Sequence, residues 1–275
     1  MIGSRATTAL LVAVTAIVFV ILYGPIVVPI ASSFFVVKHG AVSWDQPSLA
    51  AYGALIGNES VLEALRNTII VGLAAVAGAM VLGTLLAFHY NAGRSKAREI
   101  LQFVVFLPFL MPPIITGLSL LIFFREIDFD RSLVTVIIGH TVFVLALVYR
   151  TVLVRLQSLS RSLVEASYDL GASGFQTFRY VLLPNLSSAM FGAAVLAFAL
   201  SFDETMITIL VTGTDNTLPI RLWAMMRLGF SPDINALVAL ILLFTTALCL
   251  LAARLTLPIT RTERSGNAGR RPQAR

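Results

Sequence analysis

Six long apolar runs divide this sequence, and they limit the chain to structures that place those runs in lipid or in a buried core. The runs cover about residues 8–35, 67–89, 100–124, 133–149, 186–211 and 234–257. Most approach or exceed the twenty or so residues that a helix needs to cross a bilayer. Hydrophobic residues make up 57% of the chain and charged residues only 12%, which excludes an ordinary soluble domain. We therefore predict an all-α integral membrane protein with six transmembrane helices.

The first run is interpreted as a retained span. It is longer than the core of a signal peptide, is interrupted by Pro25 and Pro29, and has no obvious small-residue cleavage site. The polar stretch that follows includes Trp44, which suits the membrane interface. Residues 1–65 are thus expected to form the first transmembrane helix and an extracytoplasmic loop.

Basic residues predict the orientation of the spans. With both termini inside, six Lys and Arg residues lie outside: Lys38, Arg66, Arg125, Arg131, Arg221 and Arg227. The other fourteen lie inside: Arg5, Arg94, Lys96, Arg98, Arg150, Arg155, Arg161, Arg179, Arg254, Arg261, Arg264, Arg270, Arg271 and Arg275. This bias predicts that both termini and the central loop are cytoplasmic. It also explains the net charge of +6 without a nucleic-acid partner. The tail, 258–275, is expected to be disordered.

The third and fourth runs contain residues that are unusual at membrane depth. Because Pro108, Pro112 and Pro113 interrupt the third run, it cannot be a straight helix. Broken backbone is tolerated there only beside protein or a water-filled cavity, so Pro112 and Pro113 are candidates to line a substrate path. A simple proline kink is the alternative. His140, in the fourth run, is interpreted as a packed or hydrogen-bonded residue, since no second His, Cys or acid completes a metal site with it.

The fifth run carries two adjacent acids, Asp203 and Glu204. An unpaired acid at this depth costs about 2.5 to 3.5 kcal/mol on insertion scales, so it should be protonated, paired or retained for a substrate. If the run is one helix, the two carboxylates diverge by about 100°, and one can face a cavity while the other pairs with a neighbour. We place both residues on the candidate substrate path. The alternative is a structural pair with a basic group on a partner chain.

A polar segment, 161–184, separates the fourth and fifth runs. Ser162 and Glu165 have the spacing of a capping box, and Gly171 suits the end of that helix. Ser173 and Gln176 repeat the spacing, and Pro184 suits the opening of the next helix. The segment is therefore predicted to form a helix, a glycine elbow and a second helix.

This segment resembles the EAA loop of ABC importer permeases. The matching residues are Glu165, Ala166, Ser167, Gly171, Val181, Leu183 and Pro184, with Ser167 in place of the second alanine and Val181 in place of the usual isoleucine. The resemblance implies the type I importer (MetI-like) permease fold, with residues 66–257 as its transmembrane core. It also implies that 161–184 is a cytoplasmic coupling loop that sits in a groove of an ATPase subunit.

Further stretches resemble the spermidine/putrescine branch of these permeases. They include FLPFLMPPIITGLSLLIFF and AFALSFDETMITILVTGTDNTLPIRLWAMMRLGFSPDINAL. The resemblance implies a translocation path for a small cationic solute in the bacterial inner membrane. It also implies three kinds of protein partner: a second permease, two ATP-binding subunits and an extracytoplasmic substrate-binding protein. Permeases for opines, other amine or amino-acid derivatives, phosphonates and ferric iron share much of the pattern, so these substrates stay open.

No phosphate-binding GxxxxGK[ST] motif, nucleophile elbow or HExxH pair occurs in the chain. We therefore expect no catalytic or metal site and no bound cofactor, and we expect ATP and Mg to bind the partner ATPase subunits. Two other classes remain: a secondary transporter, which would follow an ion gradient, and a structural or signalling subunit, whose deletion would leave uptake normal.

Overall fold

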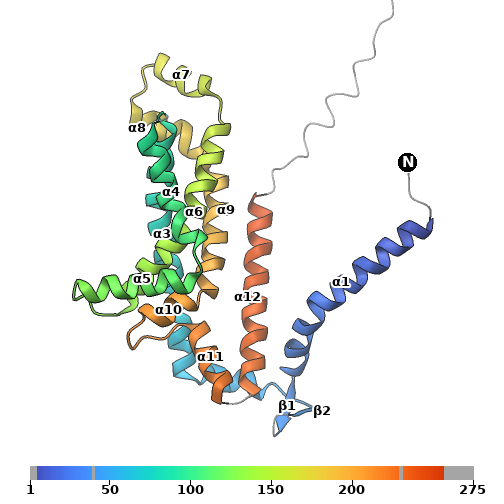
Figure 1. Ribbon diagram of the computed structural model, residues 1–275. Coiled ribbons are helices and arrows are strands. Elements are labelled where there is room, and N and C mark those ends of the chain that lie inside the picture. The colour runs from blue at the N-terminus through green and yellow to red at the C-terminus, as the bar shows by residue number, and fades with distance from the viewer. Residues whose placement is uncertain (1–4, 39–40, 94, 229–231, 257–275) are drawn as a thin grey trace, which may run out of the picture. The chain divides into compact units, whose positions relative to one another are not determined.

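The computed structural model describes residues 5–38, 41–93, 95–228 and 232–256. Its long helices are α1 (Arg5–Ser32), α3 (Glu59–Asn91), α4 (Lys96–Leu110), α5 (Pro113–Glu126), α6 (Leu133–Ser158), α9 (Leu183–Asp203), α11 (Leu218–Leu228) and α12 (Pro232–Thr256) (Figure 1). The shorter elements are α2 (Ala50–Ile56), α7 (Arg161–Asp169), α8 (Gly174–Gln176), the π-helix η1 (Thr177–Leu182) and α10 (Met206–Val211). Strands β1 (Phe35–Lys38) and β2 (Ala41–Pro47) pair as an antiparallel hairpin.

Four helical segments in the described ranges are long and apolar enough to cross a membrane: Thr7–Ser32, Glu59–Asn91, Leu133–Ser158 and Gly174–Asp203. A fifth span is possible if the pair α4 and α5 counts as one, with a bend of 108° at its break. The predicted sixth run lies in α12. Its apolar part, Asp233–Ala247, is shorter than the 18 residues required of a candidate span. The helical membrane architecture is thus confirmed, with four or five of the six predicted spans meeting this length test.

The break in the third run falls between α4 and α5. Met111 leaves the helix with extended backbone (ψ 147°), and Pro113 opens α5, where its missing N–H costs nothing. Pro108 lies within α4. The prediction that this run is not a straight helix is confirmed, and Pro112 lies in the break.

Two polar segments between the predicted apolar runs contain regular structure. The first, 38–65, includes β2, α2 and the start of α3, and the second, 212–233, includes α11. In α11, Leu218, Leu222 and Met226 recur every four residues, so they fall on one helix face. The helix covers only 11 residues and lies in a stretch with many polar residues, so the sequence did not predict it.

The chain forms two compact units. The first comprises Met1–Ala74, Pro113–His140 and Phe202–Thr246, and the second comprises Ala75–Pro112, Thr141–Ser201 and Ala247–Arg275. The predicted tail, 258–275, lies outside the described residues. In the first unit, α1 leaves almost all of its apolar surface exposed, as expected of a helix that meets lipid or a partner chain.

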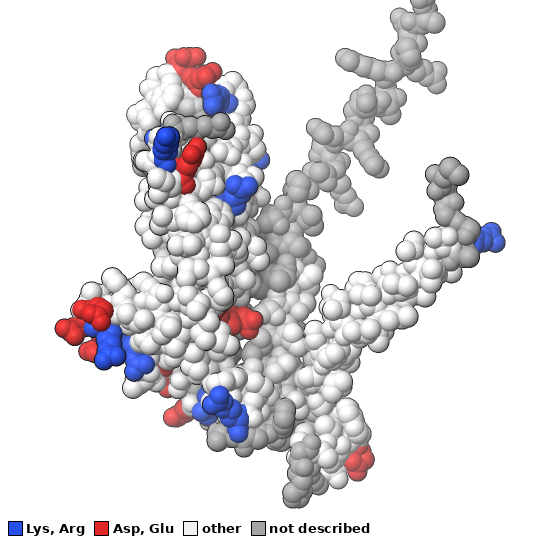
Figure 2. Space-filling model, in the orientation of Figure 1, with Lys and Arg blue, Asp and Glu red and all other residues white. Residues whose placement is uncertain are grey.

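The core of the second unit lies among α3, α4, α6 and α9. Tyr149 is fully buried there, and its ring packs edge to face with the rings of Tyr90 and Phe106. A Cβ on Gly83 would lie only 3.0 Å from the backbone nitrogen of Tyr149, so α3 and α6 approach closely because this residue is glycine. Figure 2 shows the charged side chains of this unit gathered toward the end that carries α7, with uncharged helix flanks elsewhere.

Candidate functional site

The predicted coupling segment begins with helix α7. Its N-cap is Ser160, whose hydroxyl accepts a hydrogen bond from the backbone N–H of Ser162 at 3.3 Å. The predicted capping box of Ser162 and Glu165 is therefore wrong by two residues. Ser160 has the extended backbone that an N-cap needs (ψ 131°), whereas Ser162 already lies inside the helix.

A glycine elbow ends α7, as predicted. Gly171 has a φ of +81°, and its N–H donates to the carbonyl of Tyr168 at 2.8 Å. The N–H of Ala172 donates to the carbonyl of Ser167 at 3.1 Å, which completes a Schellman motif. A Cβ on Gly171 would meet no atom within 4 Å, so the glycine is required for its backbone conformation and not for space.

The second half of the segment starts with the predicted capping box. The hydroxyl of Ser173 accepts from the N–H of Gln176, and the Gln176 side chain accepts from the N–H of Ser173 at 2.7 Å. The helix then continues through η1 into α9, which begins at Leu183, one residue before Pro184. Short π-helices often mark functional positions, and no residue pattern predicted this one.

Ser167 joins the two halves of the segment. Its hydroxyl lies 2.6 Å from the hydroxyl of Thr177, and both side chains are buried. The next residue, Phe178, packs edge to face on Phe88 of α3, with ring centroids 5.4 Å apart. The elbow is therefore closed by a polar contact and attached to a long helix by an aromatic one. The sequence alone predicted neither Thr177 as the partner of Ser167 nor Phe88 as the partner of Phe178. The serine at 167, in place of the usual alanine, was the one signal for the first of these contacts.

The outer surface of the segment is exposed. Glu165, Ala166 and Pro184 are exposed, whereas Leu183 is half-buried. Five large apolar side chains of the segment are exposed as well: Leu163, Tyr168, Leu170, Phe175 and Tyr180, with Leu170 the most exposed at 89%. Exposed apolar side chains grouped on one short segment are typical of a surface that another protein covers.

The second candidate site lies where the fifth apolar run breaks. Helix α9 ends at Asp203 and α10 begins at Met206, so the expected single helix across both acids is wrong. The carboxylate of Glu204 accepts a hydrogen bond from the N–H of Ile207 at 2.9 Å and is buried. It satisfies one of the free N–H groups at the start of α10, which explains how the break is stabilised.

Glycines and a histidine hold α10 in place. A Cβ on Gly117 of α5 would lie 3.0 Å from the Cα of Ile207, and one on Gly139 of α6 would lie 2.8 Å from an Ile207 methyl group. His140 Nε2 lies 2.7 Å from the hydroxyl of Thr208, which itself donates to the carbonyl of Glu204 at 2.8 Å. A hydroxyl has one proton, so His140 must be the donor to Thr208. The interpretation of His140 as a hydrogen-bonded residue is confirmed.

The loop between α10 and α11 is fastened to neighbouring helices. The carbonyl of Val211 accepts from the Thr135 hydroxyl at 2.7 Å, and the N–H of Leu218 donates to the Thr68 hydroxyl at 2.7 Å. The carbonyl of Asn216 accepts from the amide of Asn67 at 3.1 Å. These bonds fix the ends of α10 and α11, and therefore the walls of the cavity beside them.

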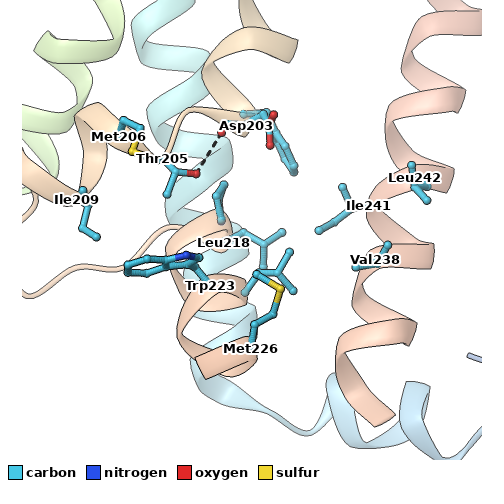
Figure 3. A pocket seen from close by; sticks show the side chains of 13 residues that line it. Asp203, Thr205, Met206, Ile209, Leu218, Trp223, Met226, Val238, Ile241 and Leu242 are labelled. Carbon is cyan, nitrogen blue, oxygen red and sulfur yellow. Dashed lines mark hydrogen bonds between the residues drawn. The ribbon is translucent and has the colours of Figure 1, made fainter. Parts of the chain in front are cut away.

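A cavity of about 380 Å³ lies among the end of α9, α10, α11 and α12 (Figure 3). Asp203 and Trp223 both line it, and in this view Leu218 lies between them while Val238 points in from α12. The walls are otherwise mainly apolar, and Asp203 is the one acid among the described lining residues. Of the four predicted path residues, this cavity includes Asp203, whereas Glu204, Pro112 and Pro113 do not line it.

The arrangement suits a ligand with a positive charge and an apolar body. A cavity of this volume is in the range of small-molecule sites, roughly 300 to 1,000 Å³. The carboxylate of Asp203 is exposed to the cavity, in contrast to the buried and hydrogen-bonded carboxylate of Glu204. Asp203 is therefore the acid that can meet a ligand here.

Comparisons with known proteins agree with this geometry. Residues 79–261 match the family model of the binding-protein-dependent transport system inner membrane component. The chain is 30% identical over 253 residues to the spermidine/putrescine transport system permease protein PotC of Escherichia coli (strain K12), covering 92% of this chain and 94% of that protein. It is 34% identical over 232 residues to the putrescine transport system permease protein PotI of the same strain, covering 82% of each.

Solved structures show the same fold at lower identity. A chain of a bacterial ABC transporter for the acidic polysaccharide alginate superposes with a TM-score of 0.71 at 18% identity, covering 93% of this chain and 96% of that one. A chain of the MetNI methionine ABC transporter superposes with a TM-score of 0.60 at 21% identity, covering 76% and 97%. The family match spans well over half of the sequence, and the chain belongs to the family of binding-protein-dependent transport system inner membrane components.

Proposed function

We propose that this chain is a permease subunit of an ATP-driven importer and forms part of the path for a polyamine, spermidine or putrescine. The identity of 30% to PotC over 92% of the chain carries this proposal. A single carboxylate, Asp203, at the wall of an otherwise mainly apolar cavity supports it, because an aliphatic amine has a charged end and an apolar chain. An opine or another amine is the alternative within the same machinery.

The segment 161–184 is proposed to couple the permease to ATP hydrolysis. The exposed Glu165, Leu170 and Phe175 support a role as the surface that an ATPase subunit covers. The buried contact of Ser167 with Thr177 and the ring contact of Phe178 with Phe88 would pass a movement of the segment to α3. A packed chain of contacts of this kind can carry coupling between sites.

The proposed assembly contains a second permease, two ATP-binding subunits that hold ATP and Mg, and an extracytoplasmic substrate-binding protein. A solved relative in fold, the alginate ABC transporter, forms a complex with a periplasmic protein that carries its ligand, and this supports such a partner here. The chain is proposed to reside in the bacterial inner membrane with both termini in the cytoplasm, as the fourteen-to-six distribution of basic residues favours.

Uptake measurements test the transport function. Labelled spermidine and putrescine are supplied to cells that lack other polyamine importers and express this chain with the second permease, the ATPase and the substrate-binding protein of its transporter. We expect ATP-dependent uptake that disappears when this chain or the ATPase is deleted. Uptake of an opine alone would support the alternative substrate, uptake that follows an ion gradient without the ATPase would support a secondary transporter, and normal uptake without this chain would support a structural role.

Reporter fusions test the orientation. A fusion after Arg275 should report the cytoplasm, and one after Asn216 should report the opposite side. Reversal of either location would contradict the proposed topology.

A further inference from the structure

Trp223 is the aromatic residue of the cavity beside Asp203. It lies on α11 one position after Leu222, and the face that carries Leu218, Leu222 and Met226 also lines the cavity. Figure 3 shows the indole ring and the Asp203 carboxylate among the side chains around the same space. An aromatic face and a carboxylate on one cavity are the two groups that recognise an organic ammonium ion, the first through its ring quadrupole and the second through its charge.

The ring already binds one cation within the chain. The guanidinium carbon of Arg227 lies 3.7 Å from the centroid of the Trp223 ring, which is the distance of a close cation–π stack. Arg227 follows Trp223 by four positions, so both side chains lie on the same side of α11. Arg227 is not among the residues that line the cavity. Trp223 thus contacts a cation of its own helix and also lines the cavity.

We infer that Trp223 is a specificity-determining residue that contacts the transported amine, and that together with Asp203 it selects a primary ammonium group on an aliphatic chain. The inference rests on the proposed function as an amine permease. Met206 and Met226 line the same cavity, and their flexible, polarisable side chains suit a methylene chain of variable length. An anionic phosphonate would meet the Asp203 carboxylate and find no basic residue among the described lining residues.

A role of Trp223 as a membrane-interface anchor is the competing explanation, since tryptophan is enriched at that depth. The two roles differ in what a substitution changes. Loss of an anchor lowers the amount or stability of inserted protein, whereas loss of a substrate contact raises KM. The other tryptophan of the chain, Trp44, provides a matched control, because it lies on β2, does not line the cavity, and packs on Phe35 with the two rings tilted by 60°.

The experiment measures KM and maximal uptake in cells that express the complete transporter with Trp223→Leu, Trp223→Phe or Trp44→Leu. The amine is spermidine or putrescine, whichever the wild-type transporter takes up. Trp223→Leu should raise KM roughly 2- to 30-fold with maximal uptake per inserted protein nearly unchanged. Trp223→Phe should recover most of the affinity because it restores a ring, and Trp44→Leu should leave KM unchanged.

Each outcome decides the inference. An unchanged KM in Trp223→Leu, or equal KM values for the Leu and Phe variants, would overturn it while amine uptake by the wild type still supports the proposed function. A loss of inserted protein with unchanged KM would assign Trp223 to anchoring. Wild-type transporter that takes up neither spermidine nor putrescine would overturn the inference and the proposed polyamine function together.

Discussion

The hydroxyl of Ser167 lies 2.6 Å from the hydroxyl of Thr177, and this buried contact closes the elbow of the coupling segment across Gly171. This contact gives a structural role to Ser167, which stands in place of the second alanine of the EAA loop that the segment resembles. The first prediction concerns this pair. Ser167→Ala or Thr177→Val alone leaves one buried hydroxyl without its partner and should cost about 1 to 3 kcal/mol in the free energy of unfolding.

The double variant Ser167→Ala/Thr177→Val should lose less than the sum of the two single changes, because it leaves neither hydroxyl unpaired. Thermal unfolding of the detergent-solubilised protein measures the three values. Additive losses in the cycle would show that the hydroxyls do not act as a pair.

The second prediction concerns Gly171. Because a Cβ there would meet nothing within 4 Å, the cost of a side chain comes from the backbone at φ +81° alone. Gly171→Val should destabilise the elbow by about 1 to 2 kcal/mol and abolish uptake, whereas Gly171→Asn should retain much of it, since asparagine tolerates this conformation.

Gly174→Ala serves as the control for Gly171, because its Cβ would meet its nearest neighbour at an ordinary 3.9 Å. Uptake by each variant is normalised to the amount of inserted protein. Wild-type uptake by Gly171→Val would contradict the coupling role of the elbow.

The third prediction separates the two adjacent acids. Asp203→Asn keeps the shape and should lower kcat/KM for a cationic substrate by about tenfold or more, with normal assembly, because it removes a charged hydrogen-bond acceptor from the cavity. Glu204→Ala should instead lower stability by about 1 to 3 kcal/mol, because it leaves the buried N–H of Ile207 unpaired.

Glu204→Gln retains an acceptor oxygen and should restore most of that stability. Uptake kinetics and thermal unfolding are measured on all three variants. If Asp203→Asn fails to assemble, the structural pairing with a partner chain is the better explanation for Asp203.

The fourth prediction concerns Gly213, in the loop after α10. A Cβ there would overlap the carbonyl oxygen of Arg131, so one of the two backbones has to move. Gly213→Ala should therefore destabilise the protein by about 1 to 3 kcal/mol and increase protease cleavage in this loop. Gly53→Ala is the control, since a Cβ at that position would meet nothing within 4 Å. Equal stability of the two variants would contradict the close approach.

The sequence by itself determined the membrane class, most of the spans and the outline of the coupling segment. These features depend on residues close together in the chain. An apolar run of sufficient length predicts a span, Ser173 and Gln176 cap a helix across three positions, and Gly171 tolerates a backbone that few other residues adopt. Even here the N-cap was misplaced by two residues, because Ser160 and Ser162 have the same side chain and differ in backbone conformation.

Only the tertiary structure decided which of two adjacent acids lines a cavity and which caps a helix. The hydrogen bond of His140 to Thr208 spans 68 positions in sequence, and that of Leu218 to Thr68 spans 150. These bonds hold α10 and α11 in place, so they position Asp203 and Trp223 around one cavity. Hydropathy treats residues 186–211 as one run, because it counts apolar side chains and does not register that a carboxylate can satisfy the N–H groups of a broken helix.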